Sequence, residues 1–151
     1  MKRSQLLTAG VVAVAVTVAP MSALAQNADP HASAHFIGKI HVHKKTATLK
    51  VRYRCASGEA LWVSAKQVAS TKKDTRLKKE GSSKTAAAWW QSHRNKFVCN
   101  GKNHTATFSI DKVEPGSKGK LEDGKAWVQF CVTQGKQTLI LSKSGWVGVK
   151  S

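Results

Sequence analysis

Apolar and polar residues alternate with a period of two along most of this chain. Between positions 46 and 55, alanine, leucine, valine, tyrosine and cysteine share one set of alternate positions, and threonine, lysine and arginine share the other. Side chains of a β-strand point alternately to its two faces, so this pattern predicts a strand with one buried and one exposed face. Similar stretches predict strands at about 36–43, 46–55, 60–69, 94–99, 104–112, 125–133 and 137–148.

Short strands of this kind, separated by glycine-containing turns, predict an all-β fold: an antiparallel, immunoglobulin-like β-sandwich of about seven strands. If the strands alternate in direction, the turns at 56–59, 100–103 and 134–136 lie at one end of the sandwich. A cysteine precedes each of these turns. We therefore expect a cysteine-bearing end, and an opposite end that carries Lys44-Lys45, the segment 70–93 and the loop 113–124.

The segment 70–93 does not follow the alternating pattern. Its lysine-rich first half, residues 71–81, is typical of a solvated, mobile loop. Its second half fits a short helix over 82–91, capped by Ser82 or Ser83 and favoured by three alanines. It fits equally a strand that turns Trp89 or Trp90 towards the core.

The N-terminus has the features of a secretory signal peptide. Lys2 and Arg3 precede an apolar run over 6–19, and Ala23-Leu24-Ala25 supplies the small residues that a signal peptidase reads. We expect a secreted protein that is cleaved after Ala25, with a flexible arm over 26–35 and one domain over 36–151. The apolar run is short for a membrane span, and no later segment of the mature chain is longer.

Positive charge is the strongest feature of the composition. Lys and Arg number 25 against 8 Asp and Glu, a formal net charge of +17, and a hydrophobic content of 41% excludes a disordered basic tail. Solubility does not require so large an excess of one sign, and such a field attracts anionic polymers or surfaces. The same charges also keep an exposed sheet face from aggregating.

Two groups of cations are candidates for binding a polyanion. Lys50, Arg52 and Arg54 share the polar face of one predicted strand, where they are spaced about 7 Å apart, a spacing similar to that of phosphates in a stretched polymer. The second group lies in the segment 70–93 and comprises Lys72, Lys73, Arg76, Lys78, Lys79 and Lys84.

The chain has three cysteines, Cys55, Cys99 and Cys131. Disulfides persist in exported proteins, and an odd number predicts one internal bridge and one unpaired thiol. Because all three cysteines are expected near one end of the sandwich, spacing alone leaves the pairing open.

Several short motifs resemble those of small secreted immunoglobulin-like proteins that are common in actinobacteria, most of which have no assigned function. Tyr53-Arg54-Cys55, the Val98-Cys99-Asn100-Gly101 turn followed by His104, and Pro115-Gly116 carry the resemblance, which covers about residues 36–148. It implies that Cys55 pairs with Cys99 and that Cys131 is left over. The third cysteine and the basic segment 70–93 depart from that pattern.

Candidates for chemistry are few. His41 and His43 would share one strand face and are weak candidates for a metal site, although exposed polar residues on an edge strand explain them better. A ribonuclease-like site would need two acid–base histidines and a cation, for which His93, His104 and Lys96 or Lys102 form a trial set. No catalytic or cofactor-binding motif is present, and we expect no cofactor.

Five tryptophans complete the candidates. Trp89 and Trp90 suit contact with a partner protein, or they cap the ends of the sandwich. The leading hypothesis is a secreted, non-enzymatic binding module that engages an anionic polymer, a surface or a protein partner. The alternatives are an adaptor subunit of a larger secreted assembly, with Trp89, Trp90 or Cys131 at the contact, and a small nuclease or toxin.

Overall fold

The computed structural model describes residues 30–135 and 138–151, and the expected signal peptide lies outside them. It confirms an all-β fold with seven strands and two short 3-10 turns. No helix in the described ranges is long and apolar enough to cross a membrane. The elements are β1 (Ser33–His43), β2 (Thr46–Arg54), β3 (Ala60–Gln67), η1 (Thr75–Lys78), η2 (Ser82–Lys84), β4 (Ala88–Arg94), β5 (Asn103–Asp111), β6 (Gly124–Gln134) and β7 (Thr138–Lys150).

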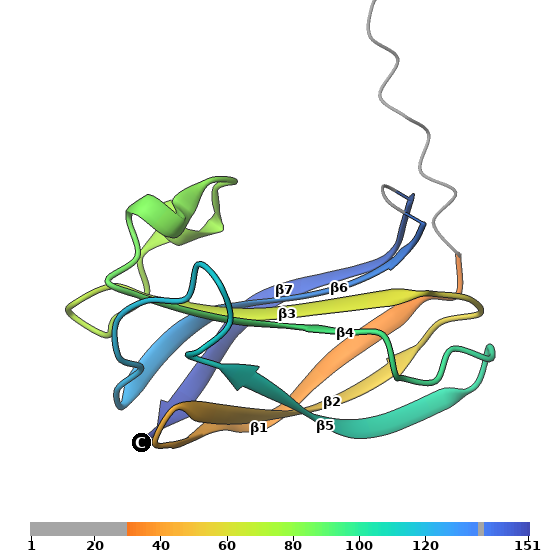
Figure 1. Cartoon of the computed structure of the whole chain (residues 1–151), viewed down its shortest axis with the longest axis horizontal. Coiled ribbons are helices and arrows are strands. Elements are labelled where there is room, and N and C mark those ends of the chain that lie inside the picture. The colour runs from red at the N-terminus through yellow and green to blue at the C-terminus, as the bar shows by residue number, and fades with distance from the viewer. Residues whose placement is uncertain (1–29, 136–137) are drawn as a thin grey trace, which may run out of the picture.

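The strands form one sheet that closes into a barrel in the order β1-β2-β5-β4-β3-β6-β7. Every neighbouring pair is antiparallel except β1 and β7. Successive strands therefore alternate in direction, as expected. Figure 1 shows the C-terminal ends of β2, β4 and β6 at one end of the molecule, and the β1–β2 turn, the β3–β4 segment and the β5–β6 loop at the other.

The barrel differs from the expected two-sheet sandwich because two weak seams join the sheets. β4 pairs with β5 only at Gln91↔Asp111. β1 pairs with β7 over two residues, after a break in its register with β2 between Ile37 and His41. Gly38 lies in that break with φ of 75°, a conformation that favours glycine, and the change of register lets one strand contact both of its neighbours.

The inner face of the barrel carries the alternate apolar residues that the sequence predicts. On β2, Ala47, Leu49, Val51 and Tyr53 are all buried, and Cys55 just beyond the strand is buried as well. Three aromatic rings pack together in the core, with the Phe108 and Phe130 ring centroids 5.2 Å apart and Tyr53 within 6 Å of both. Edge-to-face packing of such rings stabilises the core beyond the area that it buries.

A disulfide joins Cys55 to Cys99 and closes a loop of 44 residues, as the resemblance implied. A loop of that length corresponds to about 4 kcal/mol of stabilisation on a chain-entropy model. The strand predicted over 94–99 is wrong: the strand is β4, and residues 95–102 form a loop. Phe97 and Cys99 alternate in burial because they pack onto the core beside the disulfide, without pairing to another strand.

The segment between β3 and β4 is folded onto the barrel, contrary to the expected mobile loop. A helix over 82–91 is also wrong, and the alternative of a strand that turns Trp90 towards the core is confirmed by β4. Leu77 on η1 is fully buried, and together with Val68 and Ala86 it packs against tryptophans of β4, β6 and β7. Asp74 caps η1 by accepting a hydrogen bond from the Arg76 backbone N–H at 2.9 Å. We call residues 68–87 the cover, which stands above β3 and β4 in Figure 1.

Candidate anion-binding face

The outer face of β1, β2 and β5 carries the first of the two predicted groups of cations. Lys50 and Arg52 are exposed and Arg54 is half-buried, and all three occupy the alternate positions of β2 that point away from the core. We call Lys50, Arg52 and Arg54 the β2 cation row. The pleat of the strand sets the Cα atoms of neighbouring members about 7 Å apart.

Side chains of the two neighbouring strands flank each cation of the row, and all of them except Ile37 are polar. Register places His35 and Thr105 beside Arg52, and Ile37 and Thr107 beside Lys50. Ser33 and Asn103 flank Arg54 in the same way. The face therefore carries mainly hydroxyl, amide and imidazole groups, together with the apolar Ile37, and has basic side chains along its middle.

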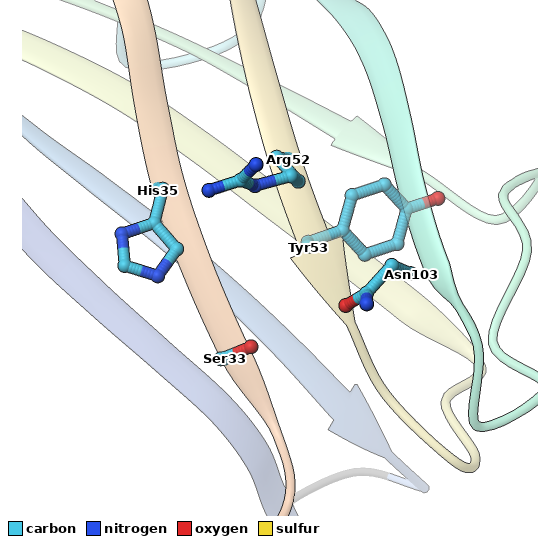
Figure 2. A pocket seen from close by; sticks show the side chains of 5 residues that line it. All are labelled: Ser33, His35, Arg52, Tyr53 and Asn103. Carbon is cyan, nitrogen blue, oxygen red and sulfur yellow. The ribbon is translucent and has the colours of Figure 1, made fainter.

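Two shallow hollows lie along this face. The first, of about 190 Å³, is lined by Ser33, His35, Arg52, Tyr53 and Asn103. Figure 2 shows the Arg52 side chain extending from β2 towards His35 on β1. Ser33 also lies on β1, and Asn103 lies on the other side of β2. The second, of about 360 Å³, surrounds Lys50 and is lined on β1 by Ile37, Gly38, Lys39 and His41, and otherwise by Thr48 and Thr107.

Carboxylates are nearly absent from this face, which leaves the row without counter-ions. Asp111 at the end of β5 is the only acidic residue of the three strands. Burial would raise its pKa, but hydrogen bonds from Arg94, Ser92 and Thr46 outweigh that effect and lower it. Throughout the described ranges, no ion pair involves a member of the β2 cation row.

The side chain of Arg54 has a hydrogen-bond donor without a partner. Its Nε is buried and has no hydrogen-bond partner in the described structure. A buried donor without a partner carries an energetic cost that an incoming acceptor removes. The row therefore presents charge together with unused hydrogen-bonding capacity.

The second predicted group of cations lies on the other side of the barrel, so the structure does not join the two groups. These residues belong to the cover, which packs on the outer face of β3, β4, β6 and β7. Arg76 is bound to Asp74 at 2.7 Å, and the Lys78 Nζ lies 5.6 Å from the centroid of the Trp127 ring. The remaining members are solvent-exposed lysines at positions 72, 73, 79 and 84.

Sequence reasoning missed a buried lysine beneath the cover. Lys66 on β3 is 5% exposed, and its Nζ donates to Ser82 Oγ at 3.0 Å and to Gln129 Oε1 at 2.9 Å. Its Nζ also lies 5.8 Å from the Trp89 ring centroid. Burial lowers the pKa of this ammonium group. Its position in the sequence does not reveal the burial, because Lys66 continues the alternation of Trp62 and Ser64 on the outer face of β3, where exposure is expected.

The tryptophans are less available to a partner than expected. Trp90 is completely buried in the core, and its indole N–H donates to the Gly119 carbonyl oxygen at 3.2 Å, so the expected partner contact at Trp90 is wrong. The Trp90 side chain faces inwards because it is two residues after Ala88, which points to the core, on the same strand. Trp89, Trp127 and Trp146 form one row on the outer face and lie against the cover.

The histidines of the trial nuclease site have different surroundings. His93 lies beside Glu114, with Nδ1 and Oε2 3.6 Å apart, whereas the His104 ring packs on Tyr53 and bonds Asn100 Oδ1 at 2.7 Å. No contact in the described structure joins His93 to His104. His41 and His43 are exposed on β1, and no group of three potential metal ligands occurs among the residues described.

Cys131 is a free thiol, the leftover cysteine of the expected scheme. It lies on the outer face of β6, where its Sγ is 3.7 Å from Ser142 Oγ. Burial raises the pKa of this thiol. A raised pKa lowers the thiolate fraction and makes the group a slow nucleophile.

No protein-family model matches the chain, and a search of curated proteins found no matching sequence.

Proposed function

We propose that this protein is an exported, non-enzymatic binding module that engages an anionic polymer through the outer face of β1, β2 and β5. One observation carries the proposal: the β2 cation row, with Lys50 and Arg52 exposed and Arg54 half-buried, lies on a mainly polar face without a counter-ion in the described structure. A disulfide, which is typical of exported proteins, supports export. Secretion with cleavage after Ala25 is part of the proposal.

A linear polyanion fits this face better than a compact anion. The cations follow one strand at intervals of about 7 Å, and the hollows lined by Arg52 and Lys50 lie along the same strand. The surrounding serine, threonine and asparagine side chains supply donors for oxygen atoms between the charges. Such a surface reads charge spacing without reading sequence, as phosphate contacts do in nucleic-acid binding.

The fold that we propose for this module is a modified immunoglobulin-like sandwich, similar to the secreted actinobacterial proteins that it resembles. The two weak seams of the barrel separate β1-β2-β5 from β4-β3-β6-β7, and these two groups would be its sheets. In this arrangement the binding face is the uncovered outer surface of the smaller sheet.

The test compares two triple variants with the same loss of charge. One changes the row (Lys50→Gln, Arg52→Gln, Arg54→Gln), and the other changes three exposed lysines of the cover (Lys72→Gln, Lys73→Gln, Lys79→Gln). Binding to heparin and to a short single-stranded DNA is measured by fluorescence anisotropy across a salt series. We expect the row variant to bind the DNA at least about tenfold more weakly and to reduce its salt slope by about 2, the value for three phosphate contacts.

The cover variant is the control for bulk charge, and we expect it to change affinity by less than about threefold. Equal losses in the two variants would show that only net charge matters and would contradict a site on β2. The proposal also fails if the unaltered protein releases both polymers at about 150 mM salt, where exposed charges are strongly screened.

A further inference from the structure

The barrel is open along part of the edge of β5. β5 pairs with β2 along its whole length, but with β4 only at Asp111. Beyond Arg94 the chain leaves the strand and runs through the loop 95–102. In Figure 1 this loop extends beside β5 at the end where β4 has already finished. The rest of β5 therefore has a strand neighbour on one side only.

The direction of the backbone groups identifies which residues form this edge. The Asp111 N–H donates to Ser92 Oγ on β4 at 3.0 Å, whereas the Lys112 N–H donates to the Lys45 carbonyl oxygen on the opposite side at 2.8 Å. Backbone groups alternate in direction along a regular strand, and the register with β2 is unbroken. The N–H and C=O groups of Thr105 and Thr107 therefore face the open side, where no backbone partner joins them in the described structure.

A groove of about 280 Å³ lies along this open edge. Tyr53 and Phe108 form its apolar floor, and Phe97 and Val98 form the opposite wall. Val98 is 49% exposed, which makes it one of the three large exposed apolar residues described. The volume is below the usual range for sites that hold a free small molecule, and it suits a few side chains of a peptide.

Two cations line the groove and select the charge of its occupant. Arg94 is already bound to Asp111 at 3.0 Å, but Lys96 is exposed and has no ion pair among the described residues. An apolar floor, unpaired backbone groups and a free lysine together require an extended chain that brings apolar side chains, backbone donors and acceptors, and a carboxylate.

We propose that this groove binds an extended segment of a partner protein, which adds a strand to β5. Its backbone pairs with Thr105 and Thr107, alternate apolar side chains lie on Tyr53 and Phe108, and an acidic residue meets Lys96. Addition of a strand to a free sheet edge is a recurrent mode of peptide recognition, with affinity from the main chain and specificity from the side-chain pockets. The groove does not include the β2 cation row, although Thr107 lines both the groove and the hollow at Lys50. The proposal does not depend on the proposed function.

The experiment pans a random heptapeptide display library against the disulfide-bonded protein at physiological salt. We expect enriched peptides to alternate apolar residues and to carry Asp or Glu. The most enriched peptide, made synthetically, should slow hydrogen exchange at the Thr105 and Thr107 amides. A selection without enrichment, or a peptide that protects amides elsewhere, overturns the proposal.

Substitutions on the groove and away from it give matched comparisons. We expect Val98→Asp to weaken binding at least about tenfold, because a buried charge faces the apolar floor. Val113→Asp changes the other strongly exposed valine, 71% exposed and outside the groove, and should leave affinity within about twofold. Lys96→Glu should reverse the preference from acidic to basic peptides.

Folding of each variant is checked by thermal unfolding, so that a misfolded protein is not counted as a loss of binding. Equal affinities for Val98→Asp and Val113→Asp would overturn the proposal. The proposal is also overturned if sedimentation shows that the protein dimerises and that Val98→Asp abolishes the dimer. A second copy of this chain, and not a partner protein, would then occupy the groove.

Discussion

The two outer surfaces of the barrel have the same alternating sequence pattern, but one is exposed to solvent and the other is covered by part of the chain. On β2 the outward positions 50, 52 and 54 carry lysine and arginine, of which Lys50 and Arg52 remain exposed and Arg54 is half-buried. On β3 the outward positions carry Trp62, Ser64 and Lys66, and the cover packs over this region until Lys66 is 5% exposed. Alternation therefore decides which side chains point outwards, but it does not decide which of them meet solvent.

The difference comes from what each surface offers to a covering segment. Trp89, Trp127 and Trp146 give the cover an apolar platform, on which Leu77 and Val68 are buried. The outer face of β1, β2 and β5 has mainly hydroxyl, imidazole and cationic groups, so a covering segment would bury polar groups there at an energetic cost. Within residues 30–135 and 138–151 no segment covers this surface, which leaves it available to an anionic ligand.

The largest expected effect comes from removal of the anchor of the cover. Leu77 is fully buried, so Leu77→Ala should lower the free energy of unfolding by about 3 kcal/mol, measured by urea denaturation. The cover should loosen, which would expose the three tryptophans and red-shift their fluorescence. Val113→Ala, at an exposed position, should change stability by less than about 0.5 kcal/mol. A Leu77→Ala protein with unchanged stability would mean that the cover is not anchored on this face.

Asp111 lies where the two surfaces meet, and its loss should have an intermediate effect. Asp111→Asn weakens the bonds to Arg94 and Ser92 and should cost about 1 to 2 kcal/mol at neutral pH. Because folding lowers the pKa of Asp111, its contribution is complete above the unfolded-state pKa of about 4 and is lost as the pH falls through the folded-state value.

Stability curves of both proteins against pH provide the measurement for Asp111. The difference between unaltered and Asp111→Asn protein should shrink as the solution becomes more acidic than about pH 4. A difference that stays constant to low pH would show that the carboxylate charge makes no contribution, and that only the shape of the side chain matters. Affinity for anionic polymers should change little, because the row itself is intact.

Much of the fold could be predicted from the sequence, because strand alternation and turn residues are local signals. Six of the seven expected strands match a strand of the structure, and the alternating strand directions follow from the short connections. The strand predicted over 94–99 was wrong, because the disulfide and Phe97 impose alternate burial on a loop. Closure of the barrel at Gln91↔Asp111 is a contact between distant residues, and no local pattern encodes it.

The candidate site was predictable in part for the same reason. The positions of Lys50, Arg52 and Arg54 on one exposed face follow from alternation alone. The hollow around Arg52 could not be predicted, since it needs the register that brings Ser33 and Asn103 to the same place. The basic segment was misread as mobile because its charges dominate its composition, while a single residue, Leu77, decides its packing.

The smallest effect, and the most direct comparison of the two surfaces, comes from one substitution made on each. Lys66→Met keeps the buried stem and removes the charge, whereas Lys50→Met does the same on the open face. Since burial lowers the pKa of Lys66, the folded protein loses that proton at a lower pH than the unfolded chain does. The buried ammonium group therefore lowers the free energy of unfolding below the folded-state pKa. Stability rises with pH from there up to the unfolded-state pKa near 10.4.

Lys66→Met should remove this rise from a series of urea titrations in alkaline buffers, and Lys50→Met should leave it intact. If Lys50→Met flattens the curve equally, then the cover does not isolate Lys66 from solvent, and the two surfaces do not differ in the way their packing indicates.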